Sequence, residues 1–168
     1  IKFKTYHKKI LSDKLTPVSI YLKLRDKFAN SLLLESSDYD VNNKNFSYIC
    51  CDAIASISVK DGKITYTYPG QKKITTKIKK NESLPNIIKN FSKKFDYKHK
   101  KYNFITNGLF GYIAHEAVSH FEDLDLDKNK DDLEIPELYY AVYKYIISVS
   151  LFNHEAHIFC HSTNNKND

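Results

Sequence analysis

Several residue types are rare or missing in this 168-residue chain: it has no Trp, no Met, a single arginine (Arg25) and three cysteines. Two of the cysteines, Cys50 and Cys51, are adjacent, and such a set is a poor disulfide framework. We therefore expect reduced, partly buried thiols in a cytoplasmic protein. No apolar run approaches the roughly 18 residues that span a bilayer, and the N-terminus lacks the apolar stretch of a secretory signal. We expect no membrane partner.

The chain is basic, with a net charge of +6, which invites a nucleic-acid-binding interpretation. Residues 89–101 interleave lysines with aromatic residues, as some surfaces that bind single strands do. However, arginine, the preferred residue for bidentate contacts to phosphates and bases, occurs only once. An amphipathic helix with a solvated lysine face explains the segment better. We therefore expect no nucleic-acid partner, and a stand-alone basic nucleic-acid-binding module remains an alternative.

The first half of the chain contains clear start and turn signals. Thr16-Pro17-Val18-Ser19 predicts a helix start, because Thr16 can cap and Pro17 suits the first helical position. Apolar spacing extends this helix to about Phe28. The continuous apolar run Leu32–Ser36 predicts a short strand buried on both faces. Further strands are predicted over residues 46–51, 53–60 and 63–68, with Asp61-Gly62 as a hairpin turn, and a second helix, capped by Ser83, over residues 84–95.

The second half is rich in aromatic and β-branched residues. Residues 138–149 and 155–161 predict two strands joined by a turn at Asn153-His154. Gly108 and Gly111 predict a bend or a close approach of two backbones. Residues 37–45, 96–101 and 122–134 are predicted loops, and residues 115–121 a short helix. The whole pattern predicts an α+β fold, a layered α/β sandwich with a mainly antiparallel sheet and a few packed helices, and residues 1–168 form one domain in this prediction.

Reactive side chains do not combine into a catalytic or metal site in the sequence. His115 and His120 miss the i, i+4 spacing of two metal ligands on one helical face. In a strand His157 and His161 share a face, but no cysteine or carboxylate completes a ligand set, and we expect these histidines to face solvent. Phosphate-binding, dinucleotide-binding and nucleophile-elbow motifs are absent. We predict no catalytic residue and no metal ligand.

Two polar residues, Glu35 and Ser36, end the apolar run after Leu34. Either they leave the core at the edge of a strand, which is the commoner case, or they line a pocket. A pocket predicts a ligand with an ammonium group for Glu35 and a hydrogen-bonding group for Ser36, such as an amino acid.

An ordered set of segments resembles the amino-terminal region of anthranilate synthase component I, a chorismate-utilising enzyme. The Thr-Pro-Val start favours it over the related large subunit of aminodeoxychorismate synthase, of the folate pathway. Two arginines of many relatives are replaced here, by Asn45 and Ser119. The resemblance covers nearly the whole chain and rests on Thr16–Ser19, Leu33–Ser36, Phe46–Ile49, Asp52–Ala55, Gly108–Tyr112, Phe121-Glu122 and Pro136 with the strand that follows it.

The resemblance implies a lyase that makes anthranilate and pyruvate from chorismate and glutamine-derived ammonia, at the start of tryptophan biosynthesis. Its Mg and chorismate ligands lie in a carboxy-terminal catalytic domain, which we expect to be absent here. The chain alone is then inactive and needs no cofactor. The implied partners are that catalytic domain, the glutamine amidotransferase subunit (component II) and L-tryptophan.

The resemblance also implies a regulatory role in feedback inhibition. Ser36, with Glu35 beside it and Pro17 on the adjoining loop, matches half of an allosteric tryptophan site. The other half of that pocket comes from the catalytic domain.

Overall fold

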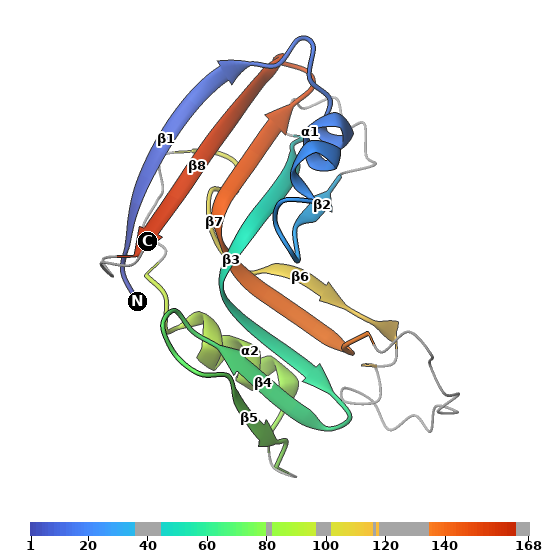
Figure 1. Ribbon diagram of the computed structural model, residues 1–168, viewed down its shortest axis with the longest axis vertical. Coiled ribbons are helices and arrows are strands. Elements are labelled where there is room, and N and C mark those ends of the chain that lie inside the picture. Colours follow the sequence, from blue (N-terminus) through green and yellow to red (C-terminus); the bar gives the residue numbers. More distant parts are fainter. Residues whose placement is uncertain (36–44, 80–81, 97–101, 116, 118–134, 164–168) are drawn as a thin grey trace. The chain divides into compact units, whose positions relative to one another are not determined.

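The computed structural model describes residues 1–35, 45–79, 82–96, 102–115, 117 and 135–163. These residues form two α-helices and eight β-strands (Figure 1). The elements are β1 (Phe3–Leu11), α1 (Pro17–Leu24), β2 (Leu32–Leu34), β3 (Ser47–Lys60), β4 (Lys63–Thr67), β5 (Ile74–Lys77), α2 (Leu84–Ser92), β6 (Phe110–Ile113), β7 (Leu138–Ser150) and β8 (Glu155–Thr163). None of the described helices is both long and apolar enough to cross a membrane.

The strands hydrogen-bond in the order β1-β8-β7-β3-β4-β5, with β2 on β3 and β6 on β7. The pairs β1/β8, β2/β3, β3/β4, β4/β5 and β7/β8 are antiparallel. The predicted antiparallel sheet with few helices is therefore confirmed, although the fold is richer in sheet than the layered sandwich that we predicted. The additional strands are β1, β5 and β6, which were not predicted from the sequence. β1 and β5 are mostly exposed, so neither shows the apolar alternation that marks a half-buried strand.

The chain divides into two compact units, each described here by itself. The first unit comprises Ile1–Ala53, Asp96–Phe110 and Val142–Asp168, and the second comprises Ile54–Phe95 and Gly111–Ala141. β3 and β7 each contribute residues to both units. Three of the four boundaries fall inside strands, namely β3, β6 and β7, so the sequence shows no linker at these positions.

In the first unit, β1, β8 and β7 lie side by side (Figure 1). A core cluster of Ile49, Val149 and Ala156 is buried in this unit. Ile20, Tyr21 and Leu24 of α1, together with Leu33 of β2, pack against that cluster. The helix and the short strand therefore share one core.

Helix α1 begins as predicted. The Thr16 hydroxyl accepts a hydrogen bond from the Ser19 N–H at 3.1 Å, and the Ser19 hydroxyl accepts one from the Thr16 N–H at 3.0 Å. This capping box satisfies two helix-end donors, and Pro17 occupies the first turn. The helix ends at Leu24, before the predicted Phe28. Phe28 packs its ring against Tyr145 instead, so its apolar character serves a tertiary contact.

Strand β2 corrects a prediction. Leu32 and Leu33 are only half-buried, and Leu34 is 37% exposed, so the strand is not buried on both faces. β2 has only three residues and lies off the main strand order, paired with β3. α1 packs beside it. An edge strand with one covered face leaves its other face open to solvent.

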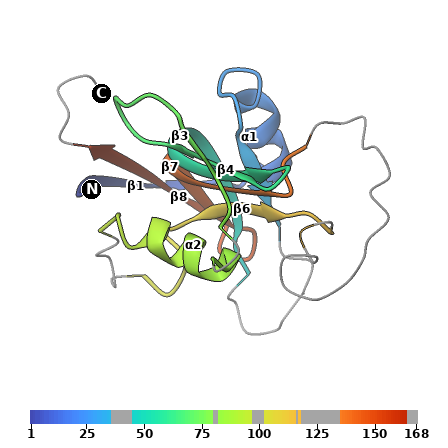
Figure 2. The same cartoon turned by 90° about the horizontal axis from the view of Figure 1, so that it is seen from below.

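The second unit contains the hairpin β3–β4 and helix α2. Asp61 and Gly62 form the predicted turn, with φ of +50° and +67°. The predicted strands 46–51 and 53–60 are one strand, in which Asp52 has a φ of +62°. α2 lies along one face of β4, where Phe91 contacts the rings of Tyr66 and Tyr68 (Figure 2).

Helix α2 begins at Leu84 as predicted but lacks the predicted side-chain cap and ends early. Ser83 occupies the N-cap position, but its side chain makes no capping hydrogen bond. The helix ends at Ser92, although Phe95 stays buried, 5% exposed, against Phe91. The predicted loops 37–45, 96–101 and 122–134, and the predicted helix 115–121, lie largely outside the described residues.

Candidate functional site

The three residues predicted to contact an amino-acid ligand fall in or beside the α1–β2 region. Pro17 is buried as the first residue of α1. Glu35 follows β2 directly and is exposed. Ser36 lies outside the described residues. Helix α1, which begins at Pro17, and strand β2, which Glu35 follows, therefore pack against the same core cluster. The position of Ser36 is not described.

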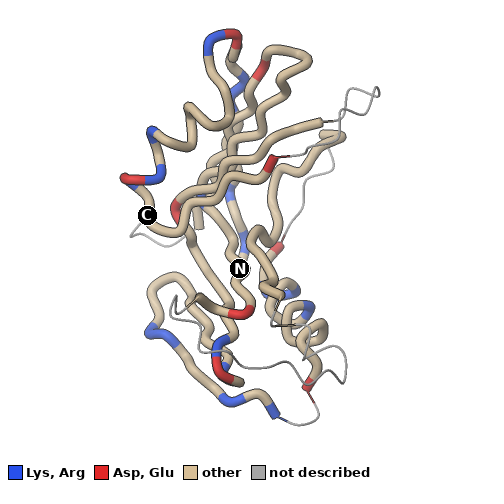
Figure 3. The backbone as a smooth tube through the Cα atoms, turned by 90° about the vertical axis from the view of Figure 1, so that its right-hand side faces the viewer, with Lys and Arg blue, Asp and Glu red and all other residues tan. Residues whose placement is uncertain are grey.

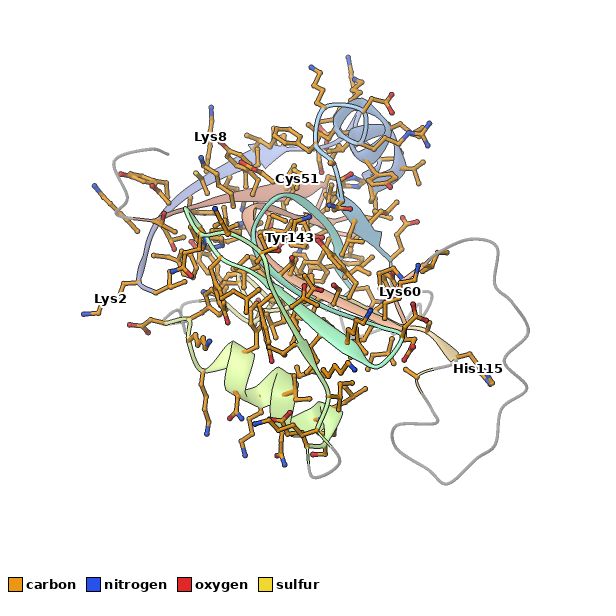
Figure 4. All side chains as sticks on the ribbon, turned by 60° about the horizontal axis from the view of Figure 1, so that its bottom comes forward. Lys2, Lys8, Cys51, Lys60, His115 and Tyr143 are labelled. Atoms are coloured by element: carbon orange, nitrogen blue, oxygen red, sulfur yellow. The ribbon has the colours of Figure 1, made fainter. Side chains whose placement is uncertain are left out.

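The connection between α1 and β2 is held at a fixed point. The Tyr143 hydroxyl of β7 donates a 2.7 Å hydrogen bond to the carbonyl of Asn30, which precedes β2. Tyr143 has no exposed surface and lies among packed side chains, whereas Lys8 of β1 points outward (Figure 4). From Asn30 the chain pairs Leu32 with Cys50 and Leu34 with Tyr48. With this register, Glu35 is the first residue after β2.

Apolar side chains remain exposed on the same two elements. Val18 and Leu22 of α1 are 45% and 47% exposed, and Leu34 of β2 is 37% exposed. They stand on elements whose other faces are packed. Chemically, the α1–β2 region offers the carboxylate of Glu35 together with these apolar groups. That combination suits a ligand that carries an ammonium group and an apolar body.

A second cluster joins β1, β8 and the segment of residues 102–106, and the sequence did not predict it. His157 and His161 are buried, 7% and 2% exposed, so the expectation that they face solvent is wrong. Their burial follows from the β1/β8 pairing and from rings of the 102–106 segment: Phe104 lies 4.8 Å from His157 between ring centroids. The one available signal was the alternation His157, Phe159, His161, which places all three on one face of a strand.

Hydrogen bonds connect the imidazoles of this cluster. His161 Nδ1 lies 2.9 Å from the Thr5 hydroxyl, and its Nε2 lies 2.9 Å from the carbonyl oxygen of Thr106. His7 Nε2 lies 3.0 Å from His157 Nδ1. His7 Nδ1 in turn lies 2.9 Å from the hydroxyl of Tyr102.

Acidic and basic groups adjoin one end of the cluster. Glu155 Oε1 lies 3.7 Å from His157 Nε2, and Lys9 forms an ion pair with the same carboxylate. The hydrogen bond from Lys9 lowers the pKa of Glu155. Within the described residues no group of three or more His, Cys, Asp or Glu side chains is placed to hold a metal ion.

The cysteines are free thiols. Cys50 and Cys51 are buried in β3, and burial raises the pKa of Cys51 to about 11 and that of Cys50 further still. A thiol that stays protonated at neutral pH is a poor nucleophile. Cys160 is half-buried. The buried pair is part of the core and does not provide a reactive centre.

Comparisons with known proteins agree with the resemblance found in the sequence. No protein-family model matches the chain. It is 24% identical over 149 residues to anthranilate synthase component 1 of Lactococcus lactis, covering 88% of this chain and 30% of that protein. It is 29% identical over 140 residues to the protein of that name from Thermus thermophilus, covering 83% of this chain and 28% of that protein.

A solved structure has the same fold. The crystal structure of anthranilate synthase component I from Streptococcus pneumoniae superposes with a TM-score of 0.52 at 15% identity, over 90% of this chain and 31% of that one. The resemblance to anthranilate synthase component I is thereby confirmed. The chain spans about 30% of the length of the curated relatives it matches.

Proposed function

We propose that this chain is the amino-terminal part of an anthranilate synthase component I and contributes half of a site for L-tryptophan. One observation carries the proposal. The match to proteins of that name takes in 77–88% of this chain but only 24–30% of each relative. A piece of this size, without a complete catalytic set among its described residues, is what a non-catalytic region contributes to a larger enzyme.

In this proposal the reaction belongs to the rest of the enzyme. The full protein makes anthranilate from chorismate and ammonia in the cytoplasm, with Mg bound by its carboxy-terminal catalytic domain and ammonia supplied by a glutamine amidotransferase subunit. This chain supplies neither metal ligands nor catalytic groups. Its partners are the catalytic domain, and through the assembled enzyme the amidotransferase.

The tryptophan half-site is built on α1 and β2. In this proposal the exposed carboxylate of Glu35 binds the ligand's ammonium group, and Ser36, the next residue in the sequence, hydrogen-bonds the ligand. Pro17 starts the helix that packs beside β2. The shared core and the bond from Tyr143 to Asn30 hold these elements in one arrangement. Feedback then requires that tryptophan bind two states of the whole enzyme with different affinities.

Binding is tested by calorimetry on the full-length enzyme that contains this chain. Glu35→Gln should weaken tryptophan binding by about 10- to 100-fold, because hydrogen bonds to charged groups contribute roughly 1.5–3 kcal/mol. Ser36→Ala should weaken it by a smaller factor. Asp26→Asn is the matched control, because it neutralises an exposed carboxylate in the α1–β2 connection. Micromolar binding to residues 1–168 alone that Ser36→Ala leaves unchanged would refute the assignment of the site.

Activity provides the second test. Residues 1–168 alone should form no fluorescent anthranilate from chorismate, ammonia and Mg, whereas the full-length enzyme should. Product above background from the isolated chain contradicts the assignment of the chemistry to another domain.

The alternatives are less well supported. The relatives found are named anthranilate synthase, not aminodeoxychorismate synthase. The position of the gene among tryptophan or folate genes decides between the two. Among the described residues, basic side chains are spread over several elements of both units, which does not favour a nucleic-acid surface on one of them (Figure 3).

A further inference from the structure

Strand β5 is the outermost strand of the sheet in the second unit. It comes last in the order of the described strands, and its strand partner among them is β4 (Figure 1). All four residues of β5 are exposed. The neighbouring strands β3 and β4 bury one face, on which Ile57, Val59 and Ile64 are at most 2% exposed. Packing in the core therefore does not account for the presence of β5.

The outer edge of β5 presents backbone groups that are directed away from β4. The Ile78 N–H donates a 2.9 Å hydrogen bond to the Gly62 carbonyl, so these two residues form a hydrogen-bonded pair at the end of the β4/β5 ladder. Opposite residues in an antiparallel ladder alternate between bonded and non-bonded pairs. Thr75 and Lys77 therefore belong to non-bonded pairs, and their N–H and C=O groups point outward. Such an edge is a template to which a further strand can add.

Lysines gather on the sheet face beside this edge. The register places Lys60 opposite Lys63, and Lys63 opposite Lys77, so three lysines occupy one row across three strands. The adjacent row carries hydroxyl groups, and those of Thr65 and Thr75 lie 3.1 Å apart. Like charges directly opposite each other destabilise a sheet. Anionic groups bound beside Lys63 and Lys77 would remove this cost.

The surroundings of the edge have a surplus of positive charge. Residues 60–79 contain six lysines and one acidic residue, Asp61. Two further carboxylates adjoin this segment, and both bind backbone groups. Glu137 Oε1 accepts the Asp61 N–H at 3.2 Å, and Glu82 Oε2 accepts the Lys79 N–H at 3.4 Å. A partner at this edge should therefore be acidic.

Charge and backbone pairing together distinguish the possible occupants. Two copies of β5 paired about Thr75 would set each Lys73 opposite a Lys77, which disfavours a second copy of this chain. Nucleic acid offers phosphates to the lysines but no peptide groups for the edge. Lysines on an edge strand ordinarily discourage the addition of strands. An extended segment with carboxylates at alternate positions avoids that repulsion, because alternate side chains lie on one face.

We propose that β5 is a docking edge for an acidic extended segment of a partner protein. The segment adds to the sheet as a strand, pairs with the backbone groups of Thr75 and Lys77, and places carboxylates beside Lys63 and Lys77. Because exposed charges are screened by salt, binding weakens as the ionic strength rises. The docking edge is independent of the tryptophan proposal, since α1 and β2 belong to the first unit.

NMR on the ¹⁵N-labelled whole chain tests the edge with a synthetic peptide, Glu-Val-Glu-Val-Glu-Val-Glu, acetylated and amidated at its ends. At a peptide concentration about ten times Kd, the hydrogen-exchange protection of the Thr75 and Lys77 amides should rise about tenfold. Binding without this rise would overturn the proposal. Protection of both amides before any peptide is added would also overturn it, because the edge would then be occupied within this chain.

Control ligands separate strand addition from attraction of charge. The same peptide N-methylated at every residue keeps its carboxylates but has no N–H groups to donate. A peptide with Lys in place of Glu keeps the backbone and reverses the charge. We expect neither to bind measurably. Equal affinity of the N-methylated peptide would refute strand addition, and tighter binding of oligouridylate than of the acidic peptide would identify a nucleic-acid surface instead.

Variants locate the contact on β5. Thr75→Pro removes an N–H that points away from β4, a position at which an edge strand tolerates proline, and it should abolish binding of the acidic peptide. Lys77→Gln, which leaves the backbone unchanged, should weaken binding about two- to fivefold. Lys89→Gln is the matched control, because Lys89 is an exposed lysine on α2, and it should leave the affinity unchanged. If Thr75→Pro does not fold, Lys77→Gln decides alone, and an affinity equal to that of the parent overturns the proposal.

Discussion

The hydroxyl of Tyr143 reaches across the first unit and donates a 2.7 Å hydrogen bond to the backbone carbonyl of Asn30. Asn30 has a φ of +56°, a left-handed conformation that Asn tolerates better than most residues. The bond therefore stabilises a strained residue at the point where the chain enters β2. It fixes the segment that carries Glu35.

Removing that hydroxyl should destabilise the fold. We expect Tyr143→Phe to lower the free energy of unfolding by about 1–2 kcal/mol, because the hydrogen bond from the buried tyrosine to the Asn30 carbonyl is lost while the ring stays in place. Urea denaturation followed by circular dichroism measures the change. Tyr145→Phe is the control, since its ring contact with Phe28 is kept, and it should change stability by less than about 0.5 kcal/mol. Equal effects of the two substitutions would contradict the role of the bond.

Gly111 is required by a close approach of two backbones in the second unit. A Cβ at this position would lie 1.9 Å from the carbonyl oxygen of Tyr139. Gly111→Ala should therefore force β6 away from β7 and lower the free energy of unfolding by about 1–3 kcal/mol. Ile113→Ala, at a position 45% exposed on the same strand, serves as the comparison in urea denaturation. A variant Gly111→Ala as stable as the parent contradicts the close approach.

The β3–β4 turn requires a left-handed backbone conformation at Gly62. Gly62 has a φ of +67° and nothing within 4 Å of an added Cβ. Gly62→Ala should thus lower the free energy of unfolding by about 1–2 kcal/mol, the cost of a left-handed conformation for an L-residue. Asp61→Asn should be nearly neutral, because Asn-Gly also favours this turn. Thermal melts of both variants check the difference, and a large effect of the Asn substitution would show that Asp61 acts through its charge.

Alkylation should distinguish the cysteines. Burial raises the pKa of Cys51 to about 11, so this thiol stays protonated at pH 8 in the folded protein. Cys50 is equally inaccessible. Iodoacetamide labelling followed by mass spectrometry should modify the half-buried Cys160 first and all three sites in denaturant. Modification of Cys51 in the folded protein as fast as that of Cys160 would contradict the burial.

The ion pair of Lys9 with Glu155 predicts a pH effect. The hydrogen bond from Lys9 lowers the pKa of Glu155, so its contribution to stability is present above the ordinary carboxyl pKa and is lost as the pH falls through the lowered value. Lys9→Gln should raise the titration midpoint of the Glu155 carboxyl, followed by ¹³C NMR, toward that of an unpaired glutamate. An unchanged midpoint means that another group sets this pKa. The gain in stability is small, because the Lys9 side chain is 55% exposed.

The sequence by itself determined the features that depend on local backbone energies. The capping box at Thr16 and Ser19, the Asp61-Gly62 turn and the β7–β8 turn at His154 each follow from residues within a few positions of one another. The aromatic strand β7 was also predictable, because its composition is extreme over 13 residues. The ordered motifs identified the relatives, and with them the region of Glu35 as the site to test.

Tertiary structure alone decided the features that depend on distant partners. β1 is mostly exposed and shows no apolar alternation, so only its pairing with β8 makes it a strand. That pairing and the 102–106 segment bury His157, although a histidine in a hairpin usually faces water. Leu34, in contrast, is exposed because β2 lies off the main strand order. Burial is set by which segments pack against a residue, and those segments are about 50 to 150 positions away in the chain.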